Sequence, residues 1–268
     1  MPRRARLDAE LVRRGLARSR EHASQLVADG RVTVRGTVAT KPATAVELDT
    51  ALVVRDNDGP NYASRGAHKL VGALERFDAV VVEGRRCLDA GASTGGFTDV
   101  LLRAGARQVV AADVGRGLLD WRLRTDDRVV VKDKTNVRAL APEDIGGPVD
   151  LVVADLSFIS LRLVLPALAS CLDEDGDLLP MVKPQFEVGR ERLGSGGVVR
   201  DPELRAEAVL DVVASAAGLG LRTHGVTASP LPGPSGNVEF FVWLRRGEPL
   251  DADTAAGLVR AAVAEGPR

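Results

Sequence analysis

The chain has 268 residues, of which 45% are hydrophobic and 27% are charged. This composition is typical of a folded protein with a full-sized core, and it excludes disordered and collagen-like chains. The longest uncharged apolar runs, such as residues 163–172, are about half as long as a membrane-spanning helix, which needs about 20 residues. The N-terminus does not have the pattern of a secretory signal, and the two cysteines lie in apolar segments. We therefore expect a cytoplasmic protein without a membrane partner.

The net charge of −1 conceals an uneven distribution along the chain. Residues 1–35 contain nine arginines and four acids, which is a local excess of +5. A basic end on a nearly neutral chain indicates an anionic partner, most often nucleic acid.

The first sixty residues predict a small α+β module. Asp8 is expected to cap one helix and Ser19 a second, with Gly30 as the stop of the second helix. Short alternating stretches at 32–34, 36–38 and 52–54 predict strands. The polar segment 56–61 predicts a linker, which divides the chain into domains 1–60 and 61–268.

Several short strings in this module carry a family resemblance. Arg6-Leu7-Asp8, Arg14-Gly15-Leu16, Ser19-Arg20 and Gly30-Arg31-Val32 resemble the RNA-binding domain of ribosomal protein S-four and of pseudouridine synthases. The module has no aromatic residue, so we expect it to bind the backbone and shape of folded RNA rather than splayed bases. On charge alone, a solvated arginine-rich face is the alternative. The expected RNA contacts are Arg4, Arg6, Arg14, Arg18, Arg20 and Arg31.

Beyond the linker, helix and strand patterns alternate as in an open α/β sheet. We predict a Rossmann-like fold with six parallel strands and an antiparallel last strand. The expected strands are 86–90, 108–113, 128–132, 150–155, 178–183, 225–229 and 239–244. The expected helices are 68–77, 96–104, 116–123, 160–171 and 202–217.

A glycine-rich turn follows the first of these strands. The sequence of residues 87–97 is Cys-Leu-Asp-Ala-Gly-Ala-Ser-Thr-Gly-Gly-Phe, and its small residues let a cofactor approach the backbone. Asp113, at the end of the next strand, is placed to hold a ribose diol. These features favour S-adenosylmethionine (SAM). Two alternatives compete with SAM. NAD binding requires Gly-x-Gly-x-x-Gly, but Ser93 stands where the middle glycine would be. The stretch 91–95 also matches the Gly-x-Ser-x-Gly nucleophile elbow of serine hydrolases, which would need His224 as the base.

Four charged residues are expected to converge at one edge of the sheet. Asp155 and Lys183 end apolar strands, and the carboxyl ends of parallel strands form the ligand-binding crevice. Glu239 begins the last strand and lies at the same edge if that strand runs antiparallel, while Lys69 opens the first helix of the domain. Each of them alone is most simply a surface charge.

Taken in chain order, the four residues Lys69, Asp155, Lys183 and Glu239 resemble the Lys-Asp-Lys-Glu tetrad of FtsJ-like ribose 2′-O-methyltransferases. The whole chain, including Ser64–Leu70, Asp155–Ser160 and Val182–Glu187, is similar to the TlyA family, some members of which are called haemolysins. The resemblance implies methyl transfer from SAM to cytidine 2′-hydroxyls in ribosomal RNA of both subunits, with no metal and no obligatory protein partner. The implied SAM-binding residues are Asp89, Gly91, Ala92, Ser93, Gly95, Gly96, Phe97, Asp113, Asn136 and Asp155.

Two questions stay open at this point. A lysine that acts as a base needs a lowered pKa, whereas neighbouring carboxylates raise it, so Lys183 is either a base or a positioning charge. An RNA-binding regulator without activity is the alternative function, and a serine hydrolase is the third.

Overall fold

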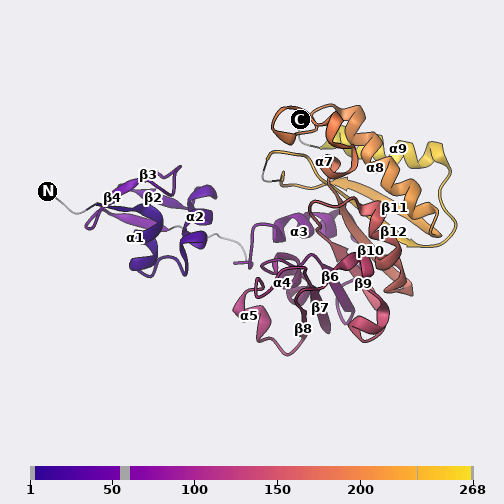
Figure 1. The fold of residues 1–268 in the computed structure, drawn as a ribbon, viewed down its shortest axis with the longest axis horizontal. Coiled ribbons are helices and arrows are strands. Elements are labelled where there is room, and N and C mark those ends of the chain that lie inside the picture. The colour runs from indigo at the N-terminus through magenta and orange to yellow at the C-terminus, as the bar shows by residue number, and fades with distance from the viewer. Residues whose placement is uncertain (1–3, 55–60, 234, 267–268) are drawn as a thin grey trace. The chain divides into compact units, whose positions relative to one another are not determined.

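The computed structural model describes residues 4–54, 61–233 and 235–266, and the chain divides into two units, Met1–Asn61 and Tyr62–Arg268 (Figure 1). The predicted linker over 56–61 lies outside the described residues, apart from Asn61. The predicted boundary after residue 60 therefore stays a prediction.

The N-terminal unit packs two helices against short strands. The helices α1 (Leu7–Arg13) and α2 (Arg20–Ala28) bury Leu7, Leu11 and Leu26. The strands form a sheet of order β3-β2-β5 and a separate pair β1-β4. Their bounds are β1 Arg4–Arg6, β2 Val32–Val34, β3 Thr37–Val38, β4 Ala45–Glu47 and β5 Leu52–Val54.

One of the two predicted helix caps in this unit is wrong. Ser19 Oγ accepts a hydrogen bond from the backbone N–H of His22, 3.1 Å away, which confirms the cap of α2. The helix α1 instead begins at Leu7, with Arg6 at the cap position, and Asp8 lies inside its first turn. The Asp8 carboxylate accepts hydrogen bonds from the guanidinium groups of Arg6 and Arg20. These contacts explain why its side chain is buried.

The second unit contains a seven-stranded sheet of order β11-β12-β10-β9-β6-β7-β8 (Figure 1). β12 pairs antiparallel with both β10 and β11, whereas β6 to β10 pair in parallel. Six strands thus run in one direction and β12 in the other, which confirms the predicted fold class. The bounds are β6 Arg86–Ala90, β7 Gln108–Ala112, β8 Val129–Lys132, β9 Val149–Ala154, β10 Leu172–Val182, β11 Leu221–Ala228 and β12 Phe240–Arg246.

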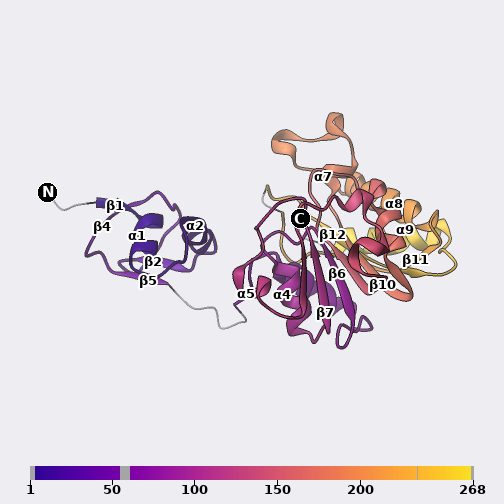
Figure 2. The same ribbon diagram turned by 60° about the horizontal axis from the view of Figure 1, so that its bottom comes forward.

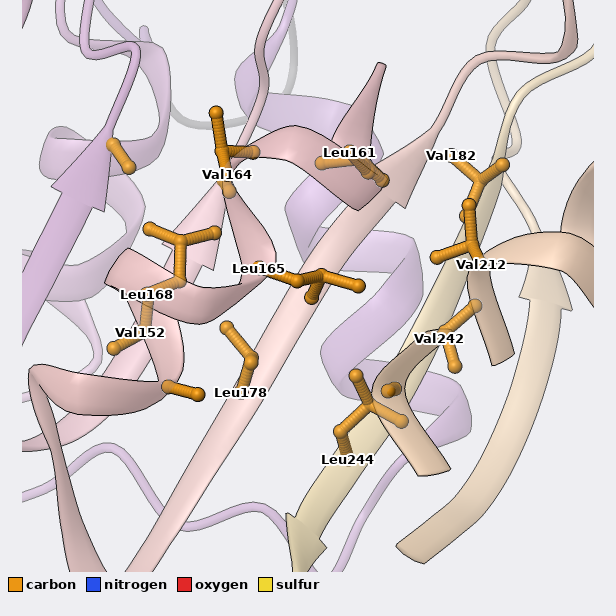
Figure 3. Packing of buried hydrophobic residues seen from close by; sticks show 14 of the residues in the cluster. Val152, Leu161, Val164, Leu165, Leu168, Leu178, Val182, Val212, Val242 and Leu244 are labelled. Atoms are coloured by element: carbon orange, nitrogen blue, oxygen red, sulfur yellow. The ribbon is translucent and has the colours of Figure 1, made fainter. Parts of the chain in front are cut away.

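Helices cover both faces of this sheet. One face packs against α3 (Ala67–Arg76), α4 (Gly96–Arg103) and α5 (Trp121–Arg124). The other face packs against α6 (Leu165–Ser170), α8 (Pro202–Ala217) and α9 (Ala252–Glu265), and Figure 3 shows Leu165, Leu168 and Val212 in this core. The short helix α7 (Pro184–Glu187) directly follows β10. Because both faces are covered, the central strands are buried on both sides and their sequences are almost entirely apolar.

Two predicted helices differ from the structure for local reasons, and one helix was missed. The helix expected over 116–123 is reduced to α5, because Gly117 has a positive φ and Asp120 caps the helix only at Trp121. The helix expected over 160–171 divides into a 3-10 turn at Leu161–Leu163 and α6. The helix α9 was not predicted at all. In the described part of the chain, no helix is long and apolar enough to cross a bilayer.

Candidate active site

Three site residues follow a row of paired alanines on neighbouring strands. Ala90 at the end of β6 pairs with Ala112 of β7 and Ala154 of β9. The next residues along each strand are Gly91, Asp113 and Asp155. Parallel register therefore places the glycine turn between the two carboxylates, as the sequence predicted for this edge of the sheet.

The glycine turn has a backbone that few side chains tolerate. Gly91, Ser93 and Gly95 have φ values of +89°, +48° and +96°. A Cβ atom at Gly91 would lie 2.5 Å from the backbone oxygen of Asp155, so this position requires glycine for conformation and for space. At Gly95 a Cβ atom would collide with the side chains of Leu119 and Leu123. The turn is thus packed tightly against the loop after β9 and the segment that leads into α5.

Asp113 fixes the loops around it. Its Oδ2 accepts a hydrogen bond from the backbone N–H of Ser93 at 2.8 Å, and its Oδ1 accepts one from Gly115 at 2.7 Å. A carboxylate has about four lone-pair sites, so each oxygen retains capacity for a ligand hydroxyl. Asp113 therefore serves as a structural anchor and also lines the cavity beside it.

Two cavities meet at the glycine turn. The larger is about 370 Å³, and the smaller is about 110 Å³. Gly91, Ser93 and Asp155 line both of them, which makes them two parts of one cleft. The larger is also lined by Asp113, Val114, Leu118, Asn136, Arg138, Leu156, Ser157, Phe158 and Ile159, and the smaller by Ser64, Gly66, Asp89, Ala92, Gly96 and Phe97.

Asp89 is a buried acid at the bottom of the smaller cavity. Its Oδ2 accepts a hydrogen bond from Thr98 Oγ1 at 2.6 Å, whereas its Oδ1 has no hydrogen-bond partner in the described structure. Burial raises the pKa of Asp89 to about 7, and the nearby charge of Asp155 adds to this effect. A partly protonated, unsatisfied carboxyl that lines a cavity is a group that a polar or cationic ligand would satisfy.

Lys183 and Asp155 form the first of two lysine–carboxylate pairs. Lys183 Nζ lies 2.6 Å from Asp155 Oδ1 and 2.9 Å from Ser157 Oγ. The Lys183 side chain is buried, whereas the Asp155 side chain is 24% exposed toward the cleft. The prediction did not include Ser157, although its position two residues after Asp155 was a usable signal.

Lys69 and Glu239 form the second pair. Lys69 Nζ lies 2.6 Å from Glu239 Oε2, and the Glu239 side chain is only 1% exposed. Glu239 directly precedes β12, whose first residue Phe240 pairs with Val182, and Lys183 follows Val182. The antiparallel direction of β12 thus brings Glu239 to the same sheet edge as Lys183. The structure joins the four predicted residues as two pairs, one between the ends of β9 and β10 and one between α3 and the start of β12.

The other predicted SAM-binding residues have mixed surroundings. Asn136 lines the larger cavity and caps a 3-10 turn through its Oδ1. The Phe97 ring packs on Phe241 in the core, with ring centroids 5.9 Å apart. A Cβ atom at Gly96 would meet Ser64 Oγ at 2.3 Å, so this glycine allows α4 to approach the start of α3.

The structure excludes the hydrolase alternative. His224 lies on β11, four strand spacings from β6, which is about 19 Å across the sheet. Its ring packs against Trp243 instead of approaching Ser93. A base must lie within hydrogen-bond reach of its nucleophile, so Ser93 and His224 cannot act together. Among the described residues, no group of three His, Cys, Asp or Glu side chains could hold a metal ion.

The arginines of the N-terminal unit are not equivalent. Arg14 donates to Glu10 and to the carbonyl oxygens of Leu48 and Thr50, so its guanidinium holds the unit together. Arg20 forms an ion pair with Asp8 but keeps 60% of its side chain exposed, and Arg4 and Arg6 are similarly exposed.

Comparisons with known proteins agree with this architecture. The S4 domain model matches residues 5–51, and the FtsJ-like methyltransferase model matches residues 62–246. The chain is 62% identical, over the full length of both proteins, to the 16S/23S rRNA (cytidine-2′-O)-methyltransferase TlyA of Mycobacterium tuberculosis strain H37Rv. It is 35% identical to Hemolysin A of Brachyspira hyodysenteriae, over 88% of this chain and 98% of that protein. The solved structure of a proposed hemolysin from Streptococcus thermophilus matches with a TM-score of 0.77 at 38% identity. The match covers 99% of this chain and 96% of the hemolysin chain.

The full-length match at 62% identity, together with an S4 match that precedes an FtsJ-like match as the sequence predicted, establishes the family. The chain belongs to the TlyA family of methyltransferases, in which an S4 domain precedes an FtsJ-like methyltransferase domain.

Proposed function

We propose that this protein transfers the methyl group of SAM to the 2′-hydroxyl of cytidines in ribosomal RNA of both the small and the large subunit. The observation that carries the proposal is the pair of Lys183 with Asp155, a carboxylate that lines both cavities at the glycine turn, next to the pair of Lys69 with Glu239 at the same end of the sheet. The Mycobacterium tuberculosis relative, named as a 16S/23S rRNA (cytidine-2′-O)-methyltransferase, supports the cytidine target and the two subunits.

The cleft fits SAM in shape and chemistry. The tight turn at Gly91, Ser93 and Gly95 leaves room for the methionine end, and the unsatisfied Oδ1 of Asp89 can accept a donor there. Asp113 would hold the ribose hydroxyls, and Asn136 would lie near the adenine, as the lining of the larger cavity allows. When bound, SAM supplies an electrophilic methyl group.

We assign Lys183 the task of orienting the target hydroxyl. An ammonium group donates three hydrogen bonds, and two of those of Lys183 are directed at Asp155 and Ser157. The third would hold the 2′-oxygen in line, at about 3 Å from the methyl carbon. As the new oxygen–carbon bond forms and the sulfur–methyl bond breaks, the hydroxyl proton would leave to solvent through the open side of the cleft. Lys69 of α3 and Glu239 at the start of β12 would extend this network.

The N-terminal unit would dock folded RNA. The proposed phosphate contacts are Arg4, Arg6, Arg18, Arg20 and Arg31, because arginine pairs with phosphate oxygens through two parallel hydrogen bonds. The internal contacts of Arg14 give it a structural role beside any contact with RNA.

The test incubates the protein and SAM with undermethylated small and large ribosomal subunits, followed by nucleoside mass spectrometry. We expect new 2′-O-methylcytidine with wild-type protein, and none with Lys183→Ala protein that still binds SAM in calorimetry. Lys183→Arg keeps the charge but cannot accept a proton, so residual activity in this variant would identify a positioning charge. SAM binding without methyl transfer by the wild-type protein would favour the RNA-binding regulator.

A further inference from the structure

Trp121 exposes a large apolar surface that the described contacts do not explain. Its side chain is 73% exposed, and it is one of two tryptophans in the chain. The other, Trp243, packs on Phe77 and donates from Nε1 to Asp177 Oδ1 at 2.6 Å. A solvent-exposed indole leaves unfavourable apolar area in water, and such a surface often marks a binding site.

The backbone of Trp121 is held firmly against the glycine turn. The neighbouring residues Leu119 and Leu123 are buried, and both lie where a side chain on Gly95 would be. The N–H of Asp120 donates to the carbonyl oxygen of Thr94 at 3.2 Å, and Asp120 Oδ1 caps α5. The indole is therefore carried by a well-anchored backbone in α5, which lies beside α4 in both views (Figures 1 and 2).

A molecule in the cleft would not cover this indole. Val114 and Leu118 are exposed apolar residues that line the larger cavity, so a bound ligand would shield them. Trp121 lines neither of the two cavities of the cleft. A molecule other than the one bound in the cleft would therefore have to cover Trp121. We call the surface of Trp121 and the neighbouring segment 115–120 the rim of the site.

Three cations without an ion pair lie on the segments next to the larger cavity. In the described structure, Arg116, Lys134 and Arg138 form no ion pair. The N–H of Lys134 donates to the carbonyl oxygen of Gly115 at 2.8 Å, next to Arg116, and Arg138 lines the larger cavity. Trp121 follows Arg116 by five residues in the segment that leads into α5, and Lys134 is bonded to that segment at Gly115. An exposed aromatic ring and cations without ion pairs on one segment are the combination that binds unpaired nucleotides, through base stacking and phosphate contacts.

We propose that Trp121 stacks on an unpaired base of the substrate RNA, while Arg116, Lys134 and Arg138 hold the adjacent phosphates. This inference rests on the proposed function and adds a second RNA contact of different chemistry. The N-terminal unit has no aromatic side chain and contributes only charge and shape, whereas the rim of the methyltransferase unit contributes stacking.

The experiment measures the fluorescence of the Trp121 indole as RNA binds. Protein-free 16S and 23S rRNA transcripts are titrated into wild-type protein and Trp121→Phe, with excitation at the red edge of indole absorption, where RNA absorbs little. Because the chain has two tryptophans, the difference between the two titrations isolates Trp121. Affinity for RNA and for SAM is then measured for Trp121→Ala. The control is Val81→Ala, an exposed apolar residue before the amino end of β6, at the opposite edge of the sheet.

We expect RNA to quench Trp121, and we expect Trp121→Ala to bind RNA about 5- to 150-fold more weakly with unchanged SAM affinity. Val81→Ala should behave as wild type. Unchanged Trp121 emission and unchanged affinity, with saturating RNA bound, would overturn the inference. A response to intact subunits but not to protein-free rRNA would overturn it in favour of a ribosomal protein contact. Methyl transfer by the wild-type protein is followed separately by mass spectrometry. If the wild-type protein methylates rRNA but Trp121 shows no response, the inference fails and the proposed function stands; if the wild-type protein does not methylate rRNA, the proposed function fails.

Discussion

The close approach of Gly91 to Asp155 can be tested with a pair of glycine substitutions. Gly91→Ala places a Cβ atom 2.5 Å from the Asp155 backbone oxygen and 3.0 Å from Leu156 Cδ2, at a φ of +89°. Gly84→Ala is the matched control, because Gly84 has a φ of +72° but nothing within 4 Å of a Cβ atom. The two variants share the conformational cost, and only Gly91→Ala adds a collision.

The loss of unfolding free energy in each variant can be estimated from the conformational cost and the collision. A left-handed conformation costs an alanine about 1–2 kcal/mol, and the stiffer unfolded chain offsets about 0.4–1 kcal/mol of that cost. Gly84→Ala should therefore lower the free energy of unfolding by about 1 kcal/mol. The collision at Gly91 adds about 1–3 kcal/mol, since both contacts must move. A shift of the Asp155 backbone also moves the carboxylate that holds Lys183, so methyl transfer should fall by about 10- to 100-fold.

Urea denaturation of both variants gives the stability difference, and single-turnover methylation gives the rate. Gly84→Ala should retain the wild-type rate. Equal stability losses in the two variants, or a wild-type rate in Gly91→Ala, would refute the argument that this glycine is required for space as well as for conformation.

Three further predictions concern individual side chains. Asp89 keeps its proton up to about pH 7 when folded but loses it near pH 4 when unfolded, so wild type should lose stability relative to Asp89→Asn as pH rises from about 4 to 7. Parallel curves of unfolding free energy against pH for the two proteins would contradict this. Ser157→Ala removes one of the two anchors of Lys183 and should reduce the methylation rate about tenfold while SAM affinity, measured by calorimetry, stays unchanged. Arg14→Ala should destabilise the N-terminal unit by about 1–3 kcal/mol in thermal unfolding, whereas Arg20→Ala should weaken RNA binding with little change in stability.

Local sequence patterns predicted much of this protein because local chemistry controls them. Ser19 caps α2 as expected, because its side chain bonds the backbone N–H of a residue only three positions ahead. The failure at Asp8, where ion pairs with Arg6 and Arg20 hold the side chain instead, shows that even a local pattern can be overridden by tertiary contacts. The positions of Asp155 and Lys183 after apolar strands were also sufficient to place them at one edge of the sheet. Parallel strands present their carboxyl ends together whatever surrounds them.

Tertiary structure decided which of these residues touch. Lys69 and Glu239 are 170 positions apart and meet only because β12 runs antiparallel beside β10. The role of Ser157, the shortening of α5 and the engagement of Arg14 with backbone carbonyls depend on packing between distant segments. A residue's own sequence neighbourhood does not encode such partners, because they are fixed by strand order and by the space left between packed elements.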